Sequence, residues 1–69
     1  MENVVVLKGD FIKLYQALKH VMGISGGEAK EIISFEDVYV NGTLEKQRGK
    51  KLRSGDHVLY KDIEIKIQL

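Results

Sequence analysis

The sequence predicts an α+β domain in which two helices pack on one side of a small, mainly antiparallel sheet. Three observations support this prediction. Apolar and polar residues alternate strictly from Ile63 to Leu69, which is the pattern of a half-buried strand. Asn41 and Gly42 follow a β-branched run and are a strong signal for a two-residue hairpin turn, because both tolerate positive φ. Apolar residues recur at three- and four-residue spacing between Phe11 and Val21, which predicts an amphipathic helix.

The N-terminal part of the chain is expected to hold one strand and the first helix. Val4 to Leu7 is a short β-branched run typical of a strand. Asp10 is the expected N-cap of the helix, and Gly23 is its expected C-terminal cap. The apolar stripe expected to be buried comprises Phe11, Leu14, Leu18 and Val21, with Tyr15 and Met22 beside them. The polar side, interpreted as a solvated face rather than a binding face, carries Lys13, Gln16, Lys19 and His20.

A second helix is predicted to begin at about Gly26. Ser25 and Glu28 have the spacing of a capping box, in which the serine side chain accepts from the Glu28 amide and the glutamate accepts from the Ser25 amide. Gly26 and Gly27 in the first turn cost ~1 kcal/mol each relative to alanine. A sequence can carry this cost where another group must approach the backbone closely. That group is either a neighbouring element or a phosphate at the helix N-terminus. Lys30 shares an exposed stripe with Gly27, within reach of such a phosphate. The buried stripe is expected to be Ala29, Ile32 and Ile33.

The predicted hairpin turn fixes which residues pair across it. Val40 is expected to pair with Thr43, and Tyr39 with Leu44. Tyr39 is then either a core residue, which is the favoured interpretation, or a surface on which a base stacks. A further strand is expected over His57 to Tyr60. The residues of the last strand expected to face the helices are Ile63, Ile65, Ile67 and Leu69.

A cationic segment lies between the hairpin and the strand at His57. The net charge is only +1, yet five basic residues and no acidic residue lie between Lys46 and Arg53, whereas acids outnumber bases in the rest of the chain. Such a segment is either a solvated loop that favours solubility or a site for a polyanion. Arg48 and Arg53 are the leading pair, because arginine suits bidentate phosphate contact. The candidate binding residues are Gly26, Gly27, Lys30, Lys46, Arg48, Lys50, Lys51 and Arg53.

Composition excludes several classes of protein. The 69 residues are expected to form a single domain, spanning 1–69, near the lower size limit for independent folding. A hydrophobic fraction of 43% argues against disorder. The absence of cysteine excludes disulfides and thiolate metal sites. The apolar runs are too short to span a bilayer, and the N-terminus lacks the pattern of a signal peptide, so a cytoplasmic protein is expected.

No arrangement of residues in the sequence indicates catalysis. His20 and His57 lie on separate predicted elements with no acidic partner at metal-ligand spacing. Ser25 and Ser54 have no recognisable base, and Ser25 is already used as a cap. The sequence contains neither a phosphate loop nor a dinucleotide fingerprint. The chain is therefore interpreted as a protein that is not an enzyme, with no cofactor, no metal and no small-molecule substrate.

The order of these signals resembles the RNA-binding domain named after small-subunit ribosomal protein S-four, also called the alpha-L motif. The resemblance covers roughly residues 11 to 60 and is carried by Ser25-x-x-Glu28-Ala29-Lys30-x-x-Ile33, by Val38-x-Val40-Asn41-Gly42, and by Gly55-Asp56 before an apolar strand. It implies the same α+β fold and a non-catalytic protein that binds structured RNA through the basic residues named above. Ribosomal or transfer RNA and the ribosome are the partners that it implies, and the chain resembles the short stand-alone members. Many members have an arginine after the capping serine, where this chain has Gly26, so the resemblance implies that RNA contact shifts toward the basic segment.

Two alternatives remain open from the sequence alone. The last strand could lie at a sheet edge and offer its backbone to a partner's strand, which would make the chain a protein-docking or assembly module. DNA could also bind the same basic residues, because both nucleic acids present the same backbone charge.

Overall fold

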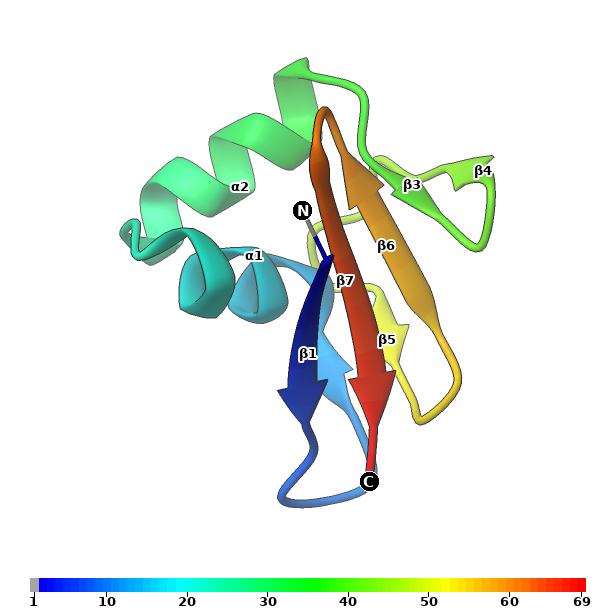
Figure 1. Cartoon of the computed structure of the whole chain (residues 1–69). Coiled ribbons are helices and arrows are strands. Elements are labelled where there is room, and N and C mark those ends of the chain that lie inside the picture. Colours follow the sequence, from blue (N-terminus) through cyan, green and yellow to red (C-terminus); the bar gives the residue numbers. More distant parts are fainter. Residues whose placement is uncertain (1) are drawn as a thin grey trace.

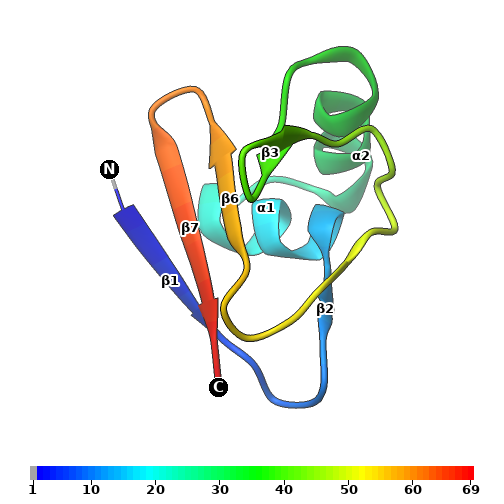
Figure 2. The ribbon, with the colours of Figure 1, turned by 90° about the vertical axis from the view of Figure 1, so that its right-hand side faces the viewer.

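A five-stranded sheet with both helices on one of its faces organises the chain, and a two-stranded ribbon adjoins it (Figure 1). The computed structural model describes residues 2–69. The strands of the large sheet are β1 (Glu2–Val6), β3 (Tyr39–Val40), β4 (Thr43–Leu44), β6 (His57–Tyr60) and β7 (Ile63–Gln68). The ribbon pairs β2 (Ile12–Lys13) with β5 (Lys51–Leu52), and the helices are α1 (Leu14–Met22) and α2 (Gly26–Phe35). Figure 2 shows both helices on the same side of the sheet, which confirms the α+β prediction.

The last strand lies inside the sheet rather than at its edge. The strand order is β1-β7-β6-β3-β4, with β1 parallel to β7 and the other neighbours antiparallel. Both sides of β7 are therefore hydrogen-bonded, and the pairing with the N-terminal segment extends to Leu7, whose amide donates to the Gln68 carbonyl at 2.8 Å. The alternative in which β7 offers a free edge to a partner is wrong, because the first strand of the chain occupies that edge.

The alternating pattern of β7 predicts its buried face except at the end of the strand. Ile65 and Ile67 are fully buried and Ile63 is half-buried, as expected. Leu69 is 80% exposed, because the strand ends at Gln68 and the terminal residue extends beyond the face that the helices cover. The buried core as a whole comprises Val5, Leu7, Leu14, Ala17, Leu18, Ala29, Ile33, Val38, Val40, Leu52, Val58, Tyr60, Ile65 and Ile67.

The first helix begins three residues later than an N-cap at Asp10 predicts. Its N-cap is Lys13, which has an extended backbone, and the helix proper starts at Leu14. The preceding residues are held extended because β2 pairs with β5. Phe11 consequently lies outside the helix and is 39% exposed, so its expected place in the buried stripe is wrong. Gly23 ends the helix with φ +67°, as predicted.

The remaining faces of α1 follow the predicted periodicity. Leu14 and Leu18 are fully buried, and Tyr15, Val21 and Met22 are half-buried against the core. The side chains of the predicted polar side are exposed: Lys13, Gln16, Lys19 and His20.

The second helix forms as its capping box predicts. The Glu28 amide donates to the Ser25 hydroxyl at 3.1 Å, and the Ser25 amide donates to the Glu28 carboxylate at 3.4 Å. The buried stripe is also confirmed, with Ala29 and Ile33 fully buried and Ile32 half-buried.

The hairpin between β3 and β4 has the predicted register, but Tyr39 is not in the core. Asn41 and Gly42 adopt φ of 52° and 82°, and Val40 pairs with Thr43. Because Val40 faces the helices, Tyr39 faces the opposite side of the sheet and is 36% exposed. The exposed side chains beside it in the neighbouring strands are Leu44 and Leu59. The favoured interpretation of Tyr39 as a core residue is therefore wrong.

Candidate nucleic-acid interface

The basic segment, residues 46–53, connects the hairpin to β6 and is fixed to the rest of the fold near its C-terminal end. Figure 2 shows this part of the chain (yellow-green to yellow) running from beside α2 down past β2. The ribbon between β5 and β2 holds Lys51 and Leu52, and the Leu52 side chain is fully buried in the core. The basic segment, also called the strip, is therefore structured. Its charged side chains are exposed on both sides of one apolar anchor, Leu52.

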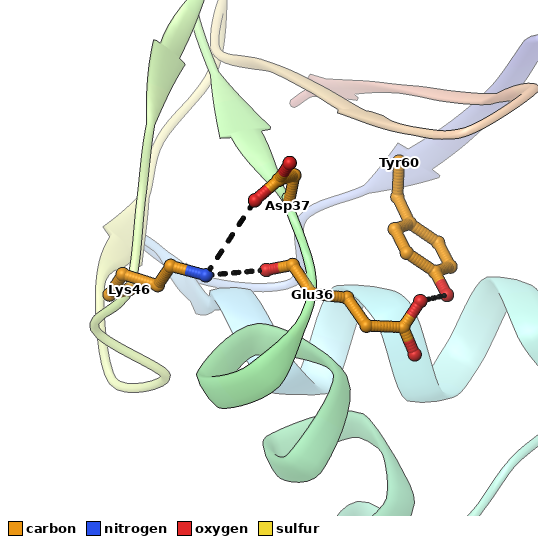
Figure 3. A network of polar contacts seen from close by, with 4 residues as sticks. All are labelled: Glu36, Asp37, Lys46 and Tyr60. Carbon is orange, nitrogen blue, oxygen red and sulfur yellow. Dashed lines mark hydrogen bonds and ion pairs between the residues drawn. The ribbon is translucent and has the colours of Figure 1, made fainter.

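At the start of the strip, Lys46 closes the C-terminal end of α2. Its Nζ donates to the backbone carbonyl of Glu36 at 2.8 Å and lies 3.8 Å from the Asp37 carboxylate (Figure 3). A cation at this position complements the negative end of the helix dipole. Lys46 thus has a local structural role, and Asp37 offsets part of its charge.

The Glu36 side chain points away from Lys46, toward β6 (Figure 3). The Tyr60 hydroxyl donates to it at 2.7 Å, and Lys61 lies 3.4 Å away. The hydrogen bond from Tyr60 is the main cause that lowers the pKa of the Glu36 carboxyl, with Lys61 adding to it and partial burial opposing it. The same bond raises the pKa of the Tyr60 hydroxyl. The backbone carbonyl and the side-chain carboxylate of Glu36 therefore both fix the C-terminal end of α2. The carboxylate is charged at neutral pH.

The middle of the strip caps the first helix with backbone atoms. The Leu14 amide donates to the Lys50 carbonyl at 2.8 Å, and the Tyr15 amide donates to the Arg48 carbonyl at 3.2 Å. These two carbonyls satisfy amides that lack a partner within the helix. Because the backbone of the strip is used in this way, the side chains of Arg48 and Lys50 extend into solvent.

Tyr15 joins the strip to the first turns of α2. While its amide binds Arg48, its ring lies 4.7 Å below the Lys30 ammonium. The ring is also adjacent to Gly26, where an added Cβ would lie 3.9 Å from it. The structure therefore brings Arg48, Lys30 and the glycine-led end of α2 together around one residue, whose backbone binds Arg48 and whose ring contacts the other two.

The two glycines at the start of α2 are not required by packing. A Cβ at Gly26 or at Gly27 would lie no closer than 3.9 Å to any neighbour outside the adjacent backbone, which is an ordinary contact. The capping box uses the Glu28 amide, whereas the amides of Gly26 and Gly27 have no acceptor within residues 2–69. Close packing of a neighbouring element therefore does not explain the two glycines.

The cations of the strip beyond Lys46 are unpaired in the described chain. Within residues 2–69, no carboxylate lies at ion-pair distance from Arg48, Lys50, Lys51 or Arg53. Lys51 and Arg53 instead lie over the ring of Phe11, at 4.8 and 5.9 Å from its centroid. These charges are therefore available to a partner.

A polar clamp that the sequence did not reveal holds the far end of the strip. Asn41 donates through its side chain to the Asp56 carboxylate at 3.0 Å and accepts from the His57 amide at 2.9 Å. Asp56 also accepts from the Arg53 amide at 2.7 Å. Asn41 therefore does more than make its turn. The Asn41-Gly42 turn and the Gly55-Asp56 motif are each visible in the sequence, but no local pattern predicts that they meet.

Tyr15 and Phe11 are the other interface residues that sequence reasoning did not identify. Their spacing predicts only the apolar stripe of the first helix, whereas the basic side chains that they contact come from segments distant in sequence. The helices within residues 2–69 are too short or too polar to cross a membrane. Over the same residues, no cluster of three or more histidine, aspartate or glutamate side chains is placed to hold a metal ion.

Comparison with protein families assigns nearly the whole chain to one of them. The model of the S4 domain matches residues 5–68. A search of curated proteins gives no match. The S4 domain is the family that the sequence resembles through its capping box, hairpin and Gly-Asp motif, and it is a generally RNA-binding, non-catalytic domain. The chain belongs to the S4 domain family.

Proposed function

We propose that this chain binds structured RNA without catalysis, by holding phosphates on one basic face. The basic face is defined here as Gly26, Gly27, Lys30, Arg48, Lys50, Lys51 and Arg53, with Lys46 at its border. The observation that carries the proposal is the junction at Tyr15, which contacts both Arg48 and Lys30 and so joins unpaired cations to the start of α2. The chain acts as a single domain over residues 1–69.

The chemistry of the face fits phosphate groups. Arg48 and Arg53 offer planar, bidentate donors, and lysines add mobile point charges. The amides of Gly26 and Gly27 point out of a helix N-terminus, where the dipole favours an anion. Without side chains at these two positions, a phosphate oxygen can reach the backbone directly. Lys46 contributes less than the others, because Asp37 and the Glu36 carbonyl already engage it.

Structured RNA is the proposed ligand because the face offers many phosphate contacts and few groups that read base edges. Phosphate contacts fix position and orientation and carry no sequence information. Double-stranded RNA regions are recognised in this way, through the shape of the A-form backbone. Ribosomal or transfer RNA in the cytoplasm, with the protein associated with the ribosome, is the setting that we propose from the family's range.

Backbone amide shifts during titration with an RNA hairpin test the proposal. The amides of Gly26, Gly27, Lys30 and residues 48–53 are expected to shift together and to give one dissociation constant. Amides on the opposite face of the sheet, around Leu59, are expected to stay in place. Shifts confined to the Leu59 region, or no shift with RNA at all, would contradict the proposed face. A DNA hairpin of the same sequence is the control, and equal affinity for it would show that the face does not select RNA.

A further inference from the structure

A groove of about 720 Å³ lies between the edge strand β1 and helix α1. Its volume is in the range of pockets that hold small organic ligands. Its lining includes apolar side chains of β1 and β2, Val6 and Ile12, together with Lys8, Lys19 and His20. Among the side chains that the structure describes, no aspartate or glutamate lines it. The lining therefore suits a ligand that combines an apolar group with a negative charge.

Phe11 stands where this groove meets the basic face. Its ring borders the groove and also lies under Lys51 and Arg53 of the basic face. The ring is 39% exposed although large aromatic side chains are normally well buried. It is fixed in this place because the next residue, Ile12, pairs with the buried Leu52.

An exposed aromatic ring flanked by unpaired cations is the composition of sites that hold single-stranded nucleic acid. In such sites bases stack on aromatic side chains while basic residues follow the backbone. The path available here runs from Arg48 through Arg53 to Phe11 and then into the groove, where Lys8 and Lys19 continue the positive charge. A duplex cannot follow this path, because its bases are stacked on one another, whereas an unpaired nucleotide can.

We propose that an unpaired nucleotide of the bound RNA enters the groove and stacks its base on Phe11, while the basic face holds the phosphates next to it. This inference rests on the proposed function and narrows the ligand to structured RNA that carries a single-stranded segment beside a helix. Phe11 then supplies affinity for the unpaired segment, and the basic face supplies affinity for the helix.

The test compares two RNA hairpins, one blunt and one with a short single-stranded uridine tail, by fluorescence anisotropy. Phe11→Ala is expected to weaken binding of the tailed hairpin roughly 5- to 150-fold, the range for loss of one base–aromatic stack, and to weaken binding of the blunt hairpin far less. Phe11→Trp should retain tight binding of the tailed hairpin. Phe35→Ala is the matched control, because Phe35 is 82% exposed but lies outside the groove and the basic face.

Photocrosslinking with 5-iodouridine in the tail provides a second readout on the wild-type protein, independent of whether any variant folds. Crosslinks at Phe11 are expected. If the wild type binds both hairpins equally and the tail crosslinks elsewhere, the stacking inference is wrong while the proposed function stands. If the wild type binds neither the tailed nor the blunt hairpin, the proposed function itself fails. A loss on Phe11→Ala that is equal for both hairpins would also overturn the inference, because a stack on an unpaired base cannot affect the blunt RNA.

Discussion

Arg48→Glu is expected to lower the affinity for structured RNA by roughly 10- to 150-fold, which corresponds to about 1.5–3 kcal/mol for a charged hydrogen-bonded contact. The Arg48 side chain is exposed and has no ion pair within residues 2–69. Only its backbone carbonyl is used in the fold, by the Tyr15 amide, so the substitution keeps that bond. Filter binding on several unrelated RNA hairpins measures the effect, and all should weaken alike because phosphate contacts do not read sequence.

Lys66→Glu is the matched control for this substitution. It changes the net charge by the same amount, but Lys66 is exposed in β7 on the side of the sheet away from the helices. Its effect on affinity is expected to be small, since it lies on the other side of the sheet and salt screens the interaction between exposed charges. Equal losses for the two variants would show that net charge, rather than the basic face, controls binding. A changed sequence preference with unchanged affinity in Arg48→Glu would favour base readout instead.

Leu52→Ala is expected to destabilise the protein by about 2–5 kcal/mol, the range for deleting a large aliphatic side chain from a core. Leu52 is fully buried and is the apolar anchor of the basic segment. A domain of this size has a total stability of only about 3–10 kcal/mol, so the substitution should remove a large share of it and lower the urea midpoint markedly. Urea denaturation followed by circular dichroism gives the change in the free energy of unfolding.

The control for this substitution is Leu69→Ala. Leu69 is the same residue type but is 80% exposed, and its truncation is expected to change the free energy of unfolding by less than about 0.5 kcal/mol. If both variants were equally stable, Leu52 would not anchor the segment. The position of the cations in the fold would then need another explanation.

The parts of the fold that the sequence predicted are those determined by neighbouring residues. The capping box at Ser25, the hairpin at Asn41 and Gly42, and the alternation of β7 each depend on interactions within a few residues. The cation-rich composition of the candidate interface was visible for the same reason, because charge density along a segment needs no knowledge of its neighbours in space.

The errors arise where a distant segment decides the local structure. Phe11 has helical spacing with Leu14, yet pairing of β2 with β5 holds the intervening residues extended and delays the helix. Similarly, β7 has the pattern of any half-buried strand, and only its partnership with β1 places it inside the sheet. The exposure of Tyr39 depends on which face the helices cover, which the pattern of β3 does not specify.

The same limit applies to the candidate interface. Nothing near Lys46 in the sequence predicts that its ammonium binds the carbonyl of Glu36, or that Tyr15 meets both Arg48 and Lys30. These contacts come from the packing of α1, α2 and the basic segment. They decide which of the cations face a partner and which serve the fold.

The salt dependence of RNA affinity tests the central claim that phosphates are held on the basic face. If about five phosphates are neutralised, the logarithm of the association constant should fall against the logarithm of salt concentration with a slope of roughly −3 to −4.5. A fluorescence titration of the wild-type protein with an RNA hairpin across a series of salt concentrations gives this slope. A slope in that range supports binding through backbone phosphates, whereas a slope near zero would contradict it.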